Sequence, residues 1–244
     1  LAEPAPALAE MPLSALPRGN RVEWTAQLKP EGYWMFGGGQ DGETQADMAP
    51  VRDRRVVWDN GQGRVQEDSL VIPGTAIKGA LSHRVAFWFN ALKGVTADGK
   101  NRAEIEALAG EANTAVRELF GCVKGRDDDA EKGQPGRVFI DDIFPSGPEP
   151  NAQIVHHVGI DRFTGGARPQ VLFDEKPLWQ GDGFELRLQV DTSTKIEDTV
   201  KKAFQRTLDD LCEGRLQLGA GSGRGLGYFR GEGRWSDGGK WIGG

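Results

Sequence analysis

Two glycine-containing segments, far apart in the sequence, combine residue types that bind phosphate. Residues 70–81 (LVIPGTAIKGAL) pass from an apolar strand through Pro-Gly into a helix whose first turn carries Thr75 and Lys78. Residues 216–229 (LQLGAGSGRGLGYF) place five glycines around Arg224. Backbone N–H groups that no side chain shields, combined with a cation, suit a phosphate group. The two segments therefore predict a polyanionic ligand.

The cations of the first segment have an electrostatic argument of their own. A lysine in the first turn of a helix is unfavourable because the helix dipole already presents positive charge there, and a bound anion would explain Lys78. Arg84 lies on a broadly similar face of the same helix and would continue a phosphate track. An ordinary solvated position is the alternative for both residues.

The glycine-rich segment matches no nucleotide-binding fingerprint. A GxGxxG pattern fails wherever it is started within residues 219–227, and no Gly-Lys-Ser/Thr string closes a P-loop. Ser222 does not sit in a nucleophile elbow, because the residues that follow it (LGYFRG) predict a strand and not a helix. A tight turn whose glycines supply positive φ angles is the alternative to a ligand-binding loop. Arg224 favours ligand contact.

Acidic residues and histidines could provide metal binding or proton transfer. The polar loop 37–53 holds four carboxylates, which offer hard oxygen ligands or a proton acceptor and are equally compatible with a solubilising loop: Asp41, Glu43, Asp47 and Asp53. His156 and His157 are adjacent, so on a strand their side chains diverge and do not share one metal ion easily. An acid/base role and a purely structural role both stay open for them.

Composition limits the class of protein. The 244 residues are 38% hydrophobic, enough for one large domain or two small ones. A formal net charge of −6 argues against indiscriminate nucleic-acid binding. The charge is uneven, however, since residues 201–244 carry eight Lys/Arg against five Asp/Glu. A local basic groove is therefore compatible with the acidic total.

Cysteine usage and the termini indicate the compartment. Cys122 and Cys212 are the only cysteines and have no metal-ligand spacing, which predicts free thiols in a reducing cytoplasm. No apolar run reaches the roughly 20 residues that cross a bilayer, so no membrane partner is expected. Residues 1–20 are rich in Ala and Pro and lack the basic start of a secretory signal. They predict a linker or extension.

The hydrophobic pattern predicts strands wrapped around two or three helices. Helical spacing begins at Thr75, a suitable N-cap, and runs through Ile77, Leu81 and Val85. The other expected helices are 101–120, closed by Gly121, and 199–211. Expected strands and hairpins are 21–28, a hairpin turning at 59–63, 137–143, a long hairpin within 159–178, 184–190 and 226–233. Without repeated βαβ units, this order predicts an α+β fold with a mainly antiparallel sheet.

These segments, in this order, resemble the RAMP superfamily, and specifically the repeated backbone subunits of type III CRISPR effector complexes. The resemblance covers the chain from about residue 21 onward. The strings that carry it are GYWMFGG (32–38), DMAPVRD (47–53), IPGTAIKGAL (72–81), LFG (119–121), RVFIDD (137–142), GIDRFTGGA (159–167), LFDEKPL (172–178) and LGAGSGRGLG (218–227).

The resemblance implies a ferredoxin-like (RRM-like) core over residues 21–244 that binds CRISPR RNA, with neighbouring effector subunits stacked along the guide. On this reading the guide phosphates contact Thr75, Lys78, Arg84, Gly221, Ser222, Gly223 and Arg224. The hairpin 160–178 would be the family's inserted thumb, which wedges into the guide–target duplex with Arg162, Phe163 and Thr164 near its tip.

The resemblance also implies a catalytic residue. Members that cut target RNA carry an aspartate in the loop before a Pro-Val or Pro-Ile, with one residue between aspartate and proline. Here Met48 and Ala49 separate Asp47 from Pro50, so the aspartate is displaced by one residue. The leading hypothesis is that Asp47 helps a divalent metal, Mg²⁺ or Mn²⁺, activate a ribose 2'-hydroxyl.

Two other functions remain open. One is a structural or capping RNA-binding subunit without chemistry of its own. The other is a ribonuclease that processes the guide precursor, for which His83, His156 and His157 are the only histidine candidates.

Overall fold

The core is a four-stranded antiparallel sheet in the order β15-β1-β14-β9. Its strands are β1 (Arg21–Pro30), β9 (Val138–Ile140), β14 (Phe184–Asp191) and β15 (Phe229–Trp235). The structure, a computed structural model, describes residues 20–40, 42, 46–123 and 133–243. The predicted linker 1–20 lies outside the described residues except for Asn20.

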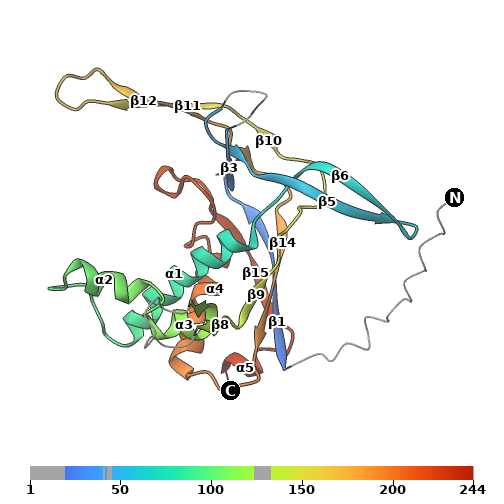
Figure 1. Cartoon of the computed structure of the whole chain (residues 1–244), viewed down its shortest axis with the longest axis vertical. Helices are drawn as coiled ribbons and strands as arrows, with labels where there is room; N and C mark the ends of the chain where they lie inside the picture. The colour runs from blue at the N-terminus through green and yellow to red at the C-terminus, as the bar shows by residue number, and fades with distance from the viewer. Residues whose placement is uncertain (1–19, 41, 43–45, 124–132, 244) are drawn as a thin grey trace.

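Two long helices, α1 (Gly74–Leu92) and α4 (Asp198–Cys212), cover the same face of this sheet (Figure 1). Alternate residues of β1 and β14 are buried beneath them, which is the period-2 pattern that the sequence predicts for these strands. The core includes Trp24, Leu28, Leu186 and Leu188 from the sheet and Ile77, Leu81, Phe204 and Leu208 from the helices. The mixed helix and strand class with antiparallel pairing is confirmed.

The N-cap of helix α1 lies two residues earlier than predicted. Pro73 is its N-cap and makes no side-chain capping bond, so the prediction that Thr75 caps the helix is wrong. The N–H of Gly74 instead donates to Asp142 Oδ1 at 2.8 Å. A Cβ at Gly74 would lie 2.5 Å from the carbonyl oxygen of Ile140, so this close approach to the end of β9 requires glycine.

The predicted helix 101–120 is two helices, α2 (Arg102–Ala109) and α3 (Thr114–Phe120). Asn101 caps the first in a capping box with Glu104, and the side chain of Asn113 accepts from the first turn of the second. Gly121, with φ at +85°, ends α3 as expected. Strand 137–143 is shorter than predicted: β9 stops at Ile140 because Asp142 turns to cap α1, and Ile143 makes only an isolated bridge to Ile72.

Two hairpins project from the body of the molecule (Figure 1). The first joins β5 (Arg52–Asp59) to β6 (Gln62–Leu70) through Asn60 and Gly61, both with positive φ, as the sequence predicts. The second joins β11 (Val155–Ile160) to β12 (Ala167–Glu175). Its first strand precedes the predicted hairpin 160–178, so the strand boundaries were wrong although the turn at Gly165 and Gly166 was placed correctly.

The remaining elements are short. A three-stranded sheet, β10-β13-β2, joins β10 (Asn151–Ala152), β13 (Leu178–Trp179) and β2 (Tyr33–Trp34). The other pairs are β3 (Gly37–Gly39) with β4 (Ala49–Pro50), and β7 (Gly121–Cys122) with β8 (Gln134–Pro135), followed at the end of the chain by α5 (Lys240–Gly243). No helix in the described part of the chain has the length and apolar character needed to span a membrane.

Candidate functional site

Three segments singled out in the sequence meet at the end of β12. The N–H of Met48 donates to the carbonyl of Asp174 at 3.1 Å, and the N–H of Lys176 donates to the carbonyl of Met48 at 2.9 Å. Arg224, from the glycine-rich loop, forms an ion pair with Glu175. We call Asp174 and Glu175 with their side-chain partners Asp47, His156, His157 and Arg224 the β12 junction.

Asp47 is exposed at this junction, and its Oδ2 accepts a 2.9 Å hydrogen bond from the N–H of Asp174. Met48, which occupies the position that the resemblance assigns to aspartate, is only partly exposed. Its side chain packs on Gly37, where an added Cβ would lie 2.5 Å from Met48 Sδ. The local backbone therefore exposes the Asp47 carboxylate and packs the Met48 thioether against Gly37.

A divalent ion is the cofactor that Asp47 is expected to help hold. Among residues 20–40, 42, 46–123 and 133–243, no group of three or more His, Cys, Asp or Glu side chains is arranged to hold a metal ion. Asp41 and Glu43 lie outside the described residues. Mg²⁺ commonly takes only one or two carboxylates together with substrate phosphates. The described donors thus fit an ion shared between Asp47 and bound RNA, not a site built from protein ligands alone.

The two histidines of β11 have different surroundings, as their opposite directions on a strand predict. His156 Nδ1 lies 2.7 Å from Asp174 Oδ1, and the His156 side chain is 71% exposed. His157 is 23% exposed, lies 3.0 Å from Glu175 Oε2 through its Nε2, and stacks on Phe173 with ring centroids 4.7 Å apart. His157 is therefore a packed residue, whereas His156 is open to a ligand.

Glu175 joins the hairpin to the glycine-rich loop. Its side chain is only 5% exposed, and a buried carboxylate requires a partner of opposite charge. Arg224 supplies that charge, and its guanidinium also lies 5.5 Å from the centre of the Phe173 ring. The side chain of Arg224 remains 40% exposed. It therefore has a structural partner and still presents surface to a ligand.

The glycine-rich loop is a tight, anchored turn with an exposed tip. Gly221 and Gly225 have positive φ and flank a short 3-10 turn, η2 (Ser222–Arg224). Gly219 and Gly227 allow close backbone approach: a Cβ at Gly219 would lie 2.2 Å from the carbonyl oxygen of Met35. The glycines therefore form a tight turn, which was one of the two predictions for this segment. The turn leaves Ser222, Gly223 and Arg224 exposed.

The first phosphate-binding segment is less open than the sequence suggests. Asp142 already supplies a carboxylate to the first N–H of α1, so an external anion is not required there. Thr75 is exposed and Lys78 is partly exposed. Among the described residues, Lys78 has no ion-pair partner, so its role in RNA contact stays a prediction.

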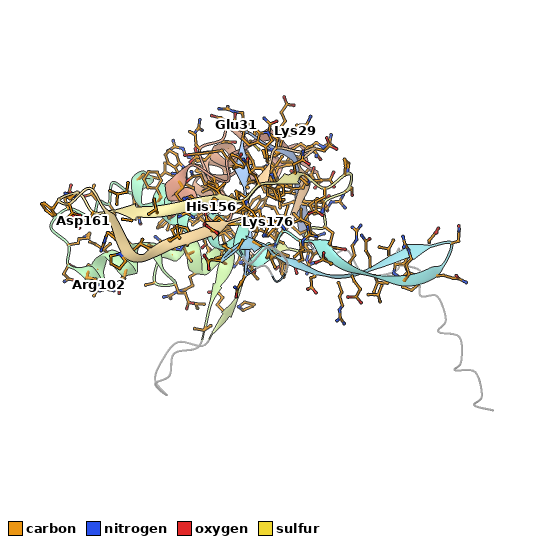
Figure 2. All side chains as sticks on the ribbon, turned by 90° about the horizontal axis from the view of Figure 1, so that it is seen from above. Lys29, Glu31, Arg102, His156, Asp161 and Lys176 are labelled. Carbon is orange, nitrogen blue, oxygen red and sulfur yellow. The ribbon has the colours of Figure 1, made fainter. Side chains whose placement is uncertain are left out.

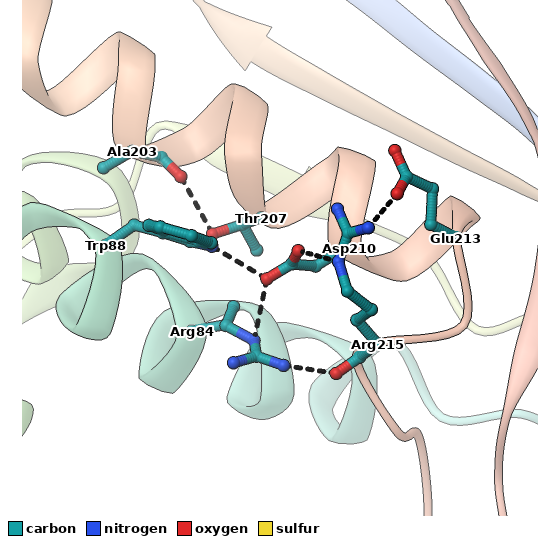
Figure 3. Close-up of polar contacts among 7 residues, drawn as sticks. All are labelled: Arg84, Trp88, Ala203, Thr207, Asp210, Glu213 and Arg215. Carbon is teal, nitrogen blue, oxygen red and sulfur yellow. Dashed lines mark hydrogen bonds and ion pairs between the residues drawn. The ribbon is translucent and has the colours of Figure 1, made fainter.

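Arg84 belongs to a polar network between α1 and α4, which Figure 3 shows. Its Nε lies 3.2 Å from Asp210 Oδ2, and it also donates to the carbonyl of Arg215. Asp210, 2% exposed, further accepts from Trp88 Nε1 at 2.8 Å and from Arg215 Nε at 2.7 Å. Arg84 therefore has a structural role, and the network accounts for its position without RNA. Its predicted phosphate contact stays a prediction.

The tip of the β11–β12 hairpin is a hydrogen-bonded turn that carries an exposed aromatic ring. Asp161 Oδ1 accepts from the N–H groups of Phe163 and Thr164, both at 2.9 Å. These bonds, the one from Thr164 first, lower the pKa of the Asp161 carboxyl. The side chains of Arg162 and Thr164 are exposed, and Phe163 is 91% exposed.

Sequence reasoning missed Asp174, Glu175 and Asp210. Asp210 had a local signal, because it lies three residues after Thr207 on the apolar stripe of α4. Nothing in the local sequence indicated that Asp174 contacts Asp47 or that Glu175 pairs with Arg224, since these partners come from segments far away in the chain.

A chain of a solved structure described as a Type IV-B CRISPR complex is 16% identical, with a TM-score of 0.46, over 86% of this chain and 90% of that chain. No curated protein matches the sequence. The profile of the RAMP superfamily matches residues 28–230, a span that contains the glycine-rich loop and the whole β12 junction. The chain belongs to the RAMP superfamily.

Proposed function

We propose that the chain is a backbone subunit of a type III CRISPR effector complex, which binds CRISPR RNA and cleaves complementary target RNA. The observation that carries the proposal is the β12 junction. One strand end holds Asp47, the base of the hairpin and Arg224 of the glycine-rich loop within hydrogen-bond or ion-pair distance. A subunit that binds guide RNA, distorts the guide–target duplex and cuts the target strand needs a phosphate-binding loop, a hairpin and a catalytic carboxylate close together.

The topology supports a ferredoxin-like core. Along the chain the main elements read β1, α1, β9, β14, α4, β15, which are two strand-helix-strand units. The sequence pattern did not predict this repeat, because long insertions separate α1 from β9 and β9 from β14. The spatial order β15-β1-β14-β9 places the last strand beside the first and the two middle strands beside each other. Both helices lie on one face, so the opposite face and the loops are left for partners (Figure 1).

Guide RNA binds through its phosphates to local cations and not through the overall charge. The net charge of −6 disfavours general attraction of RNA. Arg224 and the exposed tip of the glycine-rich loop form one contact, and Lys78 on α1 forms another. The exposed Phe163 is the wedge of the thumb, because an exposed aromatic ring on a hydrogen-bonded turn can stack on or separate bases. Neighbouring effector subunits extend this arrangement along the guide.

Cleavage depends on Asp47. The exposed carboxylate lies at the base of the hairpin, where the target strand would be held distorted beside it. A divalent ion shared between Asp47 and the RNA would supply Lewis-acid stabilisation of the phosphate. The Asp174 N–H fixes one carboxylate oxygen, which orients the group before RNA arrives.

The test is Asp47→Ala in the assembled complex with guide and target RNA. We expect loss of Mg²⁺- or Mn²⁺-dependent cutting with target binding preserved, since a loop carboxylate acts on the transition state and base pairing holds the target. Asp53→Ala is the matched control, because Asp53 is exposed nearby on β5 and should not affect cutting. Equal cutting by wild type and Asp47→Ala would refute this assignment.

A specific observation favours a second candidate, a structural subunit without catalysis. Asp47 Oδ2 is already engaged by Asp174, and the described residues form no preassembled metal cage. A wild-type complex that binds target RNA and never cuts it through this subunit would establish this alternative.

A further inference from the structure

We propose that His156, held by Asp174, is the general base for the cleavage assigned to Asp47; this inference rests on the proposed function. His156 and Asp174 are direct partners across the β11–β12 pair. Their side chains meet at 2.7 Å between Nδ1 and Oδ1. An ionised carboxylate only accepts hydrogen bonds, so in the neutral form of the ring Nδ1 carries the hydrogen and Nε2 presents its lone pair.

Asp174 links this histidine to the proposed catalytic carboxylate. Its side chain holds His156, while its backbone N–H donates to Asp47 Oδ2 at 2.9 Å. A second hydrogen bond joins the same two segments, because the Met48 N–H donates to the Asp174 carbonyl. One residue therefore orients both groups. Figure 2 shows His156 near Lys176 at the base of the hairpin, away from Asp161 at its tip.

The other histidines lack this combination. His157 is packed between Glu175 and the Phe173 ring and is 23% exposed. His83 is exposed on α1 and has no ion-pair or hydrogen-bond partner in the described part of the chain. Only His156 has an orienting carboxylate and a ring exposed enough, at 71%, for a bound RNA strand to reach.

The proposed cleavage of the target RNA is an internal transesterification. His156 Nε2 accepts the proton of the ribose 2'-hydroxyl, and the 2'-oxygen forms a bond to the adjacent phosphorus. The bond from phosphorus to the 5'-oxygen breaks, and that oxygen takes a proton from water. His156 then returns its proton to the resulting hydroxide. The products are a 2',3'-cyclic phosphate and a 5'-hydroxyl, with no net change in protons or electrons.

The experiment measures single-turnover target cleavage by assembled complexes that contain His156→Ala. General base catalysis typically contributes about 10²–10⁴-fold, so we expect a rate loss of that order with target binding unchanged. Free imidazole should restore part of the rate, which it would not do if His156 were merely structural. Asp174→Asn keeps the backbone bond to Asp47 and removes the orienting charge, so it should lower the rate less than His156→Ala.

His83→Ala is the matched control and should cut at the wild-type rate. Wild-type cutting by His156→Ala, alongside an inactive Asp47→Ala, would overturn the role of His156 and leave the proposed function intact. A slow His156→Ala complex that imidazole does not rescue would also overturn it. A wild-type complex that does not cut would refute both proposals.

Discussion

At the scale of single residues, Arg224 and Lys78 are two cations with different neighbours. Arg224 neutralises the buried Glu175 and remains 40% exposed. A guanidinium has five N–H donors, so donors remain for a phosphate after one carboxylate is bound. Lys78 is partly exposed and has no acidic partner among the described residues. Removal of either charge should therefore weaken RNA binding, but only Arg224 should also affect the fold.

We predict that Lys78→Ala and Arg224→Ala each weaken guide-RNA binding and reduce its salt dependence. Each lost phosphate contact on a single strand should lower the log–log slope by roughly 0.7. Arg224→Ala should in addition lower the unfolding midpoint, because Glu175 would be buried without its cation. Fluorescence anisotropy of a labelled guide over a salt series measures the slopes, and urea denaturation measures stability.

Arg102→Ala is the control for this pair of variants. Arg102 is 92% exposed on α2, and among the described residues its one ion-pair partner is Glu106 in the next turn. Its removal should leave both slope and stability unchanged. A double variant of Lys78 and Arg224 with the wild-type slope would show that neither residue contacts phosphate.

At the scale of elements, Asp210 links α4 to α1 through hydrogen bonds and ion pairs. Its buried carboxylate accepts from Trp88 and pairs with Arg84 and Arg215 (Figure 3). We predict that Asp210→Ala lowers the free energy of unfolding by about 3 kcal/mol, the lower end for a broken buried pair because both arginines stay partly exposed. Asp210→Asn, which retains an acceptor for Trp88, should cost less. Urea midpoints at an unchanged m-value measure both.

Asp209→Ala tests whether any acidic change in this turn has the same effect. Asp209 is only partly buried, and its side chain accepts from Gln205 on the same helix. We expect a loss of about 1 kcal/mol or less. Equal destabilisation by Asp209→Ala and Asp210→Ala would contradict the assignment of Asp210 as the residue that links the two helices.

The elements also show what local sequence can and cannot specify. Apolar spacing located α1 and α4 because each buries one stripe against the sheet. The split of 101–120 was missed because its Ala, Glu and Leu content favours helix, while Asn101 and Asn113 define two separate starts. Glu175 could not be identified, since its burial depends on Arg224, which is 49 residues away.

At the scale of the whole molecule, one compact core carries two arms. The β5–β6 and β11–β12 hairpins are two-stranded sheets that extend beyond the body (Figures 1 and 2). Large apolar side chains on them are exposed, including Trp58 at 72% and Leu172 at 70%. A two-stranded sheet with exposed faces gains little from burial, so its hydrogen bonds open more easily than those of the core.

We therefore predict a graded pattern of amide hydrogen exchange. Amides of β1 and β14, which pair with each other over the buried core, should exchange slowest, and those of β5–β6 and β11–β12 should exchange much faster in the free protein.

Guide and target RNA should then protect β11–β12, since the proposed function places this hairpin in the duplex. Phe163→Ala, a change at a 91% exposed position, should leave the free-protein pattern unchanged and reduce the protection that RNA gives. Mass spectrometry of peptides from both hairpins measures this. Uniformly slow exchange would contradict the two-arm description, and RNA protection confined to β5–β6 would move the thumb to that hairpin.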